Sequence, residues 1–214
     1  MERVIILGAG AHAAEIEGYI EDNNQAGANI EIVGYLDDAP ENHQSYGLKA
    51  PLLGGLFGYS VPKGVQLIIA VNNVKIRERI IEEYKKSKFF TFVHVSSRVF
   101  HNAEMGIGNI ICPFTQIGPK VKIGSFNTFN NKASIGHDCI IGDNNIFCPN
   151  VGLSGNTHIG NSNFFSLNVA TIPNVKIGNK NIIAPNMVIE KTIKNGSYFF
   201  HRFKEVVLVI PKEN

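Results

Sequence analysis

The sequence is poor in the features that mark secreted and membrane-spanning proteins. It has three cysteines, Cys112, Cys139 and Cys148, and neither their odd number nor their spacing fits a disulfide framework or a CxxC metal site. No stretch approaches the roughly 18 apolar residues of a membrane span. The N-terminus lacks the basic segment and long apolar run of a signal peptide. These absences predict a cytoplasmic protein with reduced thiols.

An excess of charge of one sign is also missing. The net charge is +2 with histidine neutral, which is too small to favour nucleic acid or an acidic membrane surface as a partner. Hydrophobic residues make up 44% of the chain and charged residues 18%, an ordinary soluble composition. A length of 214 residues allows one large domain or two small ones.

The first part of the chain, residues 1–96, alternates strand-like and helix-like segments. This alternation predicts an α/β domain of Rossmann-like type. The strand-like segments are 4–7, 30–36, 65–71 and 89–93, and the helix-like segments are 13–20 and 75–88. Residues 39–63 carry prolines and paired glycines, so we expect them to be rich in loops.

From Val99 to Ile189, every sixth residue is apolar with the single exception of Thr171. The positions are Val99, Met105, Ile111, Ile117, Ile123, Phe129, Ile135, Ile141, Phe147, Leu153, Ile159, Phe165, Thr171, Ile177, Ile183 and Ile189, of which fifteen of sixteen are apolar. A half-buried strand predicts a period of two and an amphipathic helix a period of 3.6. Neither explains a strict period of six.

A longer period of eighteen lies over the period of six. It brings an asparagine to the same point of each cycle, at Asn109, Asn127, Asn145, Asn163 and Asn181. Three sixes make one coil, so the pattern predicts a hexapeptide-repeat parallel β-helix over residues 97–193. We expect the asparagines to stack as a ladder that bonds turn backbone. We expect the recurrent glycines at corners, where positive φ or close backbone approach is needed. The tail, residues 194–214, should pack over the end of the coil or onto a neighbouring subunit.

His137 and Asp138 are the first candidates for chemistry. They follow inward-facing Ile135, which places them at or beside a corner of the coil. An imidazole can take a proton near neutral pH, and a carboxylate at its other nitrogen can fix the tautomer. Neighbouring residues of a regular strand point apart, so the two side chains can meet only if the corner bends the chain. On spacing alone, a solvated surface pair is the plainer interpretation.

A second candidate site lies in the first domain. Gly8, Gly10 and His12 stand between a strand and a helix, where free backbone N–H groups bind phosphate. Asp37 and Asp38 end the next strand, where an acidic residue can bind a ribose hydroxyl. Ala13 occupies the third glycine position of the dinucleotide fingerprint, so a plain strand-to-helix turn and a solvated acidic turn remain open alternatives.

A metal site is not expected. His101 and His137 are two coils apart and could line up, as histidines do in the γ-class carbonic anhydrases. That class needs a further histidine five residues after the second one, where Gly142 stands. We therefore expect His101 and His158 to be surface residues.

The whole chain resembles the bacterial sugar O- and N-acyltransferases, which join a small Rossmann-like domain to a left-handed β-helix. The strongest match is the phrase Ser-Ile-Gly-His-Asp-Cys-Ile-Ile-Gly at residues 134–142, followed by Leu-Ser-Gly at 153–155. The resemblance, and not the spacing, implies that the β-helix is left-handed. It further implies that His137 is the general base and that Asp138 assists it.

The same resemblance implies a nucleotide-sugar acceptor and acetyl-CoA as donor, with no metal. The residues implied in acceptor binding are Gly8, Gly10, His12, Asp37, Asp38, Asn73 and Asn130. The residues implied in donor binding are Gly155, whose amide would face the thioester carbonyl, and Phe165, Leu167, Ala184 and Pro185 of a second subunit in a homotrimer. His201, Arg202 and Lys204 replace the family's usual C-terminal turn and are candidates for contact with CoA phosphates.

Three functions follow from these residues. The first is N-acetylation of a nucleotide-linked 4-amino sugar, favoured by His12 with Asp37 and Asp38. The second is O-acetylation of sialic acid or a related sugar. The third is a non-catalytic β-helix trimer that binds nucleotide-sugars, against which His137 and Asp138 together argue. An NAD-linked enzyme is a weaker reading because the third glycine of the fingerprint is missing.

Overall fold

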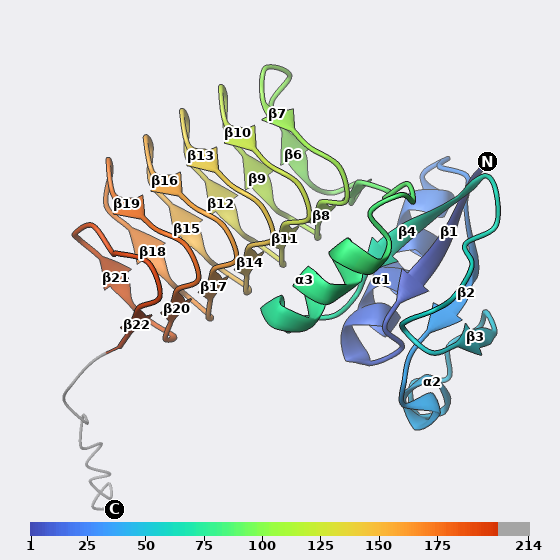
Figure 1. Cartoon of the computed structure of the whole chain (residues 1–214). Coiled ribbons are helices and arrows are strands. Elements are labelled where there is room, and N and C mark those ends of the chain that lie inside the picture. The colour runs from blue at the N-terminus through green and yellow to red at the C-terminus, as the bar shows by residue number, and fades with distance from the viewer. Residues whose placement is uncertain (201–214) are drawn as a thin grey trace, which may run out of the picture.

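The computed structural model describes residues 1–200 and has the predicted two-part architecture (Figure 1). An N-terminal α/β domain is followed by a parallel β-helix of the left-handed type. The candidate donor contacts His201, Arg202 and Lys204 lie outside the described residues. No helix in the described part of the chain is long and apolar enough to cross a membrane.

The N-terminal domain is built on a parallel four-stranded sheet with the order β3-β2-β1-β4. Its strands are β1 (Glu2–Leu7), β2 (Ile30–Leu36), β3 (Leu52–Gly54) and β4 (Val65–Ile69), and its helices are α1 (Ala11–Gln25), α2 (Pro40–Ser45) and α3 (Val74–Glu83). From β1 the chain passes through α1 to β2 on one side of β1, and it later reaches β4 on the other side. The carboxyl ends of β1 and β4 therefore form the switch point at which α/β domains bind ligands.

Two sequence-based expectations for this domain need correction. Residues 39–63 are less loop-rich than expected, because Pro40 begins α2 and the edge strand β3 pairs with the end of β2. The expected strand 89–93 is divided between the two parts of the chain. Phe89 bridges to Leu67 of the α/β sheet, whereas β5 (Phe92–Val93) pairs with β8 and is the first strand of the β-helix.

The β-helix consists of two-residue strands joined by corners and arranged in three parallel sheets, here called faces I, II and III. Face I contains β5 (Phe92–Val93), β8 (Ile110–Ile111), β11 (Thr128–Phe129), β14 (Ile146–Phe147), β17 (Phe164–Phe165), β20 (Ile182–Ile183) and β22 (Tyr198–Phe199). Face II contains β6 (Arg98–Val99), β9 (Gln116–Ile117), β12 (Ser134–Ile135), β15 (Gly152–Leu153), β18 (Ala170–Thr171) and β21 (Val188–Ile189). Face III contains β7 (Glu104–Met105), β10 (Lys122–Ile123), β13 (Ile140–Ile141), β16 (His158–Ile159) and β19 (Lys176–Ile177). These strands extend a few residues beyond both ends of the expected range 97–193.

The predicted six-residue register is confirmed. The second residue of each strand points into the coil, and from Ile111 to Ile189 all of these residues are at most 5% exposed. On face I the inward rings of Phe129, Phe147 and Phe165 stack nearly parallel, with centroids of successive rings 4.7 and 4.8 Å apart. Burial of this continuous apolar column is the main source of stability in a solenoid.

The predicted asparagine ladder is also confirmed. The five asparagines are fully buried, and each side-chain oxygen of the first four accepts the backbone N–H of the asparagine in the next coil, at 2.8–2.9 Å. The amide of Asn145 also donates to Gly160 O at 2.9 Å. The ladder therefore satisfies backbone groups that the corner would otherwise leave unpaired.

The expectation for the corner glycines is only half correct. Gly124 and Gly142 do meet the next coil closely, since a Cβ on either would lie 2.8 Å from a backbone oxygen. They do not have positive φ. That conformation belongs to thirteen non-glycine residues spaced by six, from Phe114 to Asn186, each three residues after an inward position. Asp138, with φ of 57°, is one of them.

The N-terminal domain covers the first coils of face I (Figure 1). The outward residues Phe92, Ile110, Thr128 and Ile146 are at most 2% exposed, whereas Ile182 further along the same face is 49% exposed. The fully buried guanidinium of Arg77 in α3 joins the two parts. It donates to Asn144 Oδ1 at 2.9 Å and to Phe126 O at 2.5 Å, and burial lowers its pKa to about 10.

Candidate active site

His137 and Asp138 meet at the corner between faces II and III. His137 Nδ1 lies 2.7 Å from Asp138 Oδ2, and the two side chains are 59% and 42% exposed. The positive φ of Asp138 turns the chain at this point, so two neighbouring side chains lie on the same side. The corner therefore bends the chain as contact between these two side chains requires. A carboxylate at Nδ1 retains the proton there and leaves the Nε2 lone pair free to accept another.

Gly155, one coil further on, lies directly beneath the ring of His137. A Cβ added to Gly155 would be 2.6 Å from both Cε1 and Nε2 of His137, so the contact requires glycine. The backbone N–H of Gly155 donates to no group in residues 1–200. Pro119, two coils before Gly155, and Pro173, one coil after it, occupy the same corner position and have no N–H. Within the described coils this donor is therefore unused, and it belongs to the residue that packs against the His137 ring.

The expected acceptor residues are mostly gathered at the carboxyl edge of the N-terminal sheet. Gly8 has φ of 105° and packs closely on Ala70, the residue after β4. Gly10 is the N-cap of α1, which has no side-chain cap and no acidic residue in its first turn. The first N–H groups of α1 are thus free to bind an anion such as a phosphate.

The acidic pair and Asn73 are already engaged by the chain itself. Asp37 accepts the N–H of Ala9 at 2.6 Å and that of Ala39 at 2.8 Å, and Asp38 accepts that of Leu56 at 2.8 Å. The side chain of Asn73 caps α3 by accepting two backbone N–H groups. These contacts fix the shape of the edge and leave the remaining oxygen lone pairs for a ligand.

His12 is turned inward and is 6% exposed. Its Nδ1 lies 3.0 Å from Glu15 Oε2, and this hydrogen bond lowers the pKa of Glu15. Its Nε2 is buried and has no partner in the described part of the chain. Asn130 lies apart from this edge, at the corner between faces I and II, next to Asn131, which bonds Tyr19 of α1.

The expected donor residues divide into two groups. Leu167 and Pro185 are exposed at the corner between faces I and II, with Ala184 partly buried beside them. Phe165 needs correction, because its ring is fully buried and stacked on Phe147 in the core. A ligand on the outer surface of the β-helix cannot touch that ring.

The remaining candidates from the sequence are the three cysteines and two further histidines. All three cysteines are free, and burial raises the pKa of each thiol. Within residues 1–200, no group of three or more His, Cys, Asp or Glu side chains could hold a metal ion. His101 and His158 are exposed, as expected.

The fold and this site define an α/β domain joined to a left-handed β-helix with a histidine–aspartate pair at one corner. Residues 3–84 match the family model described as the PglD N-terminal domain. A comparison with curated proteins finds no match. The family match and the structures that share the fold confirm the resemblance predicted from the motifs.

Three solved structures illustrate that shared fold. The acetyltransferase domain of PglB from Neisseria gonorrhoeae FA1090, in complex with acetyl coenzyme A, is 21% identical with a TM-score of 0.80, over 92% of this chain and 95% of that one. PerB from Caulobacter crescentus, in complex with CoA and GDP-perosamine, is 22% identical with a TM-score of 0.77, over 92% and 93%. WeeI from Acinetobacter baumannii AYE is 20% identical with a TM-score of 0.70, over 92% and 96%.

Proposed function

We propose that the protein is an acetyl-CoA-dependent N-acetyltransferase that acts on the amino group of a nucleotide-linked 4-amino sugar. The observation that carries the proposal is the contact of His137 with Asp138 directly over Gly155. It brings a proton acceptor and an unused N–H donor to one point. Complexes of the similar proteins with acetyl coenzyme A and with GDP-perosamine support the donor and the class of acceptor.

The proposed reaction is a direct transfer. The sugar amine attacks the thioester carbonyl carbon, a C–N bond forms, and Nε2 of His137 takes the proton that the nitrogen loses. Negative charge develops on the carbonyl oxygen, which accepts a hydrogen bond from the N–H of Gly155. The C–S bond then breaks, the carbonyl re-forms, and the proton passes from His137 to the CoA sulfur. No covalent enzyme intermediate is required.

Two chains should build each site in a homotrimer. His137 stands on the edge between faces II and III, whereas the N-terminal domain covers the opposite side, face I. An acceptor held at the sheet edge of one chain is thus separated by the β-helix from that chain's own His137. A neighbouring copy would present Leu167, Ala184 and Pro185, which belong to a different corner, to the donor. We propose that acceptor, base and donor surface meet between subunits.

The test is thiol release from acetyl-CoA in the presence of UDP-, dTDP- and GDP-linked 4-amino sugars and free sialic acid. Rapid release with one amino sugar is the expected result, and release with sialic acid alone would favour O-acetylation. Absence of both release and acetyl-CoA binding would favour a non-catalytic nucleotide-sugar-binding trimer. The mass in solution, measured by light scattering, tests the trimer separately.

The role of His137 has a matched control in the same corner position. His137→Ala should lower kcat by at least a hundredfold, because general base catalysis contributes about 10²–10⁴, and should leave acetyl-CoA binding close to normal. His101→Ala removes an exposed histidine two coils earlier and should keep full activity. Near-normal turnover by His137→Ala would exclude this residue as the base.

A further inference from the structure

The buried guanidinium of Arg77 spans the joint between the two parts of the chain. Its Nη1 donates to Ile69 O at 3.2 Å and to Val71 O at 3.1 Å, so it holds the carboxyl end of β4. Its Nε and Nη2 donate to Asn144 Oδ1 and to Phe126 O, which belong to successive coils of the β-helix. One planar group with fixed donors therefore binds the N-terminal sheet on one side and the β-helix on the other.

The end of β4 that Arg77 holds is part of the edge where we place the acceptor. Ala70 lies between the two residues whose carbonyl groups Arg77 bonds, and its own carbonyl oxygen would be 3.2 Å from a Cβ on Gly8. The backbone oxygen of Asn73 accepts the N–H of Arg77 at 2.9 Å. Residues 69–73 are thus braced by Arg77, and the Gly8 loop packs against them.

Stability alone does not explain a charge at this joint. All four acceptors of the guanidinium are neutral amide oxygens, so none of them compensates its charge. Burial of such a charge costs free energy, and well-packed apolar side chains often stabilise the same contact equally well. Apolar surfaces can shift against one another, whereas directed hydrogen bonds favour one geometry. A defined position is therefore what Arg77 supplies and an apolar side chain lacks.

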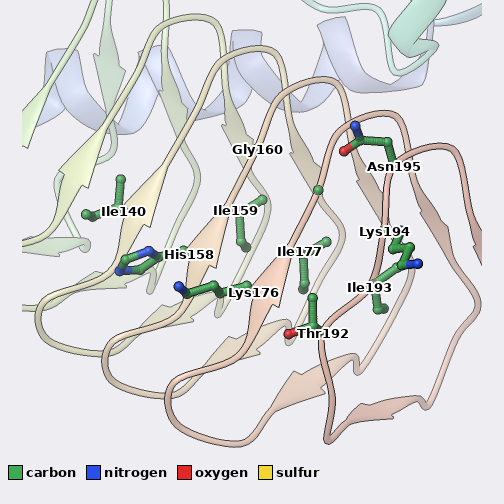
Figure 2. Close-up of a pocket in the computed structure, with 11 residues that line it drawn as sticks. Ile140, His158, Ile159, Gly160, Lys176, Ile177, Thr192, Ile193, Lys194 and Asn195 are labelled. Carbon is green, nitrogen blue, oxygen red and sulfur yellow. The ribbon is translucent and has the colours of Figure 1, made fainter.

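Asn144 is the partner of Arg77 at the corner between faces III and I. It is 4% exposed, and its Nδ2 also donates to Val74 O of α3 at 3.3 Å. Lys180, at the same corner two coils further on, is exposed. The adjoining part of face III is uncovered as well, with His158 and Lys176 at the surface (Figure 2). Because α3 covers this corner at Asn144 and leaves it open further along, Arg77 and Asn144 set where α3 sits on the β-helix.

We propose that Arg77 and Asn144 are positioning residues, which hold the acceptor edge of one chain where the sugar amine meets the base of a neighbouring copy. This inference rests on the proposed function, because it takes acceptor and base from different subunits of a homotrimer. The two residues act through the acceptor edge and touch no substrate themselves. A shift of the N-terminal domain on its β-helix moves the amine relative to the base, and a misplacement of about 1 Å lowers a rate about a hundredfold.

Asn144→Gly tests the joint without disturbing the acceptor edge. Asn144 has φ of 55°, which glycine adopts without strain, and Arg77 keeps its two bonds to the end of β4. In the thiol-release assay, kcat with the preferred nucleotide-linked amino sugar should fall about 10- to 100-fold. Binding of acetyl-CoA, and of whichever of UDP, dTDP or GDP the acceptor carries, should stay within twofold of wild type by calorimetry.

Lys180→Gly is the matched control for this variant. Lys180 has φ of 58°, occupies the same corner and is exposed, with only a 3.8 Å ion pair to Glu78 to lose. Its replacement should leave kcat and both binding constants at wild-type values, because an exposed pair of this kind contributes little.

Arg77→Lys separates the geometry of the joint from its charge. Lysine keeps the positive charge, but a single ammonium cannot bond the acceptors on both sides as the guanidinium fork does. This variant should lower kcat at least as much as Asn144→Gly. It should also weaken binding of the nucleoside diphosphate, because the end of β4 loses its brace. Wild-type kcat in Arg77→Lys would show that charge, and not position, is what the joint requires.

A purely structural role gives a different pattern, provided that each variant is assayed below its first unfolding transition. Unchanged kcat in Asn144→Gly would overturn the inference while the proposed function stands. So would a fall in kcat matched by the same fall in the fraction of protein that binds the diphosphate. If wild-type protein acetylates none of the nucleotide-linked amino sugars, the proposed function is wrong and the inference falls with it.

Discussion

Replacement of Gly155 by alanine tests the geometry of the proposed site directly. The added Cβ would lie 2.6 Å from Cε1 and Nε2 of His137, where ordinary carbon contacts are 3.5 Å or more. Gly155 does not have positive φ, so its backbone accepts alanine without strain. Alanine also keeps the backbone N–H that we propose as the donor to the thioester carbonyl. The substitution therefore changes the position of the His137 ring and little else.

The magnitude follows from the overlap. Relief of the contact requires the ring to move by about 1 Å, and a misplacement of that size lowers a rate about a hundredfold. His137 is 59% exposed, so its ring can swing toward solvent without disturbing the core. We therefore expect kcat to fall about a hundredfold, with less than about 1 kcal/mol of change in the free energy of unfolding, as for a surface substitution.

The assay is steady-state thiol release with the acceptor that the wild-type protein prefers. Gly152→Ala is the matched control, since it lies on the same coil, has no atom within 4 Å of its added Cβ, and pairs with Ala170 on the next coil. This variant should keep wild-type kcat and KM. A kcat of Gly155→Ala within threefold of wild type would refute the placement of the base over Gly155.

Two further predictions concern the framework that holds the site. Asn145→Ala removes a ladder amide whose oxygen accepts from Asn163 N and Nδ2 and whose nitrogen donates to Asn127 Oδ1 and Gly160 O. Because two buried donors of Asn163 are left unpaired, the free energy of unfolding should fall by about 3–6 kcal/mol. Asn181→Ala removes one accepted bond, from Ser197 N, and an Nδ2 that has no partner within residues 1–200, so its cost in urea unfolding should be about 1 kcal/mol. Equal costs for the two variants would argue against the ladder. Arg77→Met should leave the β-helix folded but loosen the N-terminal domain, so that calorimetry shows a separate transition at lower temperature. One unchanged transition would show that Arg77 does not join the two parts.

The β-helix was predictable because its period is a local property of the chain. Each inward residue occurs six positions after the last, and burial enforces the same choice in every coil. The six-residue register also predicts which side chains are buried in the core and so cannot contact a ligand. Phe165 belongs to the inward series, so the sequence alone argues against its side chain as a donor contact. The resemblance to known enzymes suggested that role, and the register overrules it.

Contacts between distant segments could not be predicted in this way. The burial of Arg77 against Phe126 and Asn144 depends on how α3 docks on face I, which no periodicity encodes.

The proposed base is in part a consequence of the coil itself. Every corner with this geometry needs a residue with positive φ three positions after the inward side chain, and Asp138 fills that position after Ile135. Asparagine and aspartate tolerate this conformation better than most residues. The turn that closes the coil therefore also swings the carboxylate onto the preceding imidazole. A His-Asp pair at these two corner positions forms its contact as the coil closes, and needs no separate element to hold it.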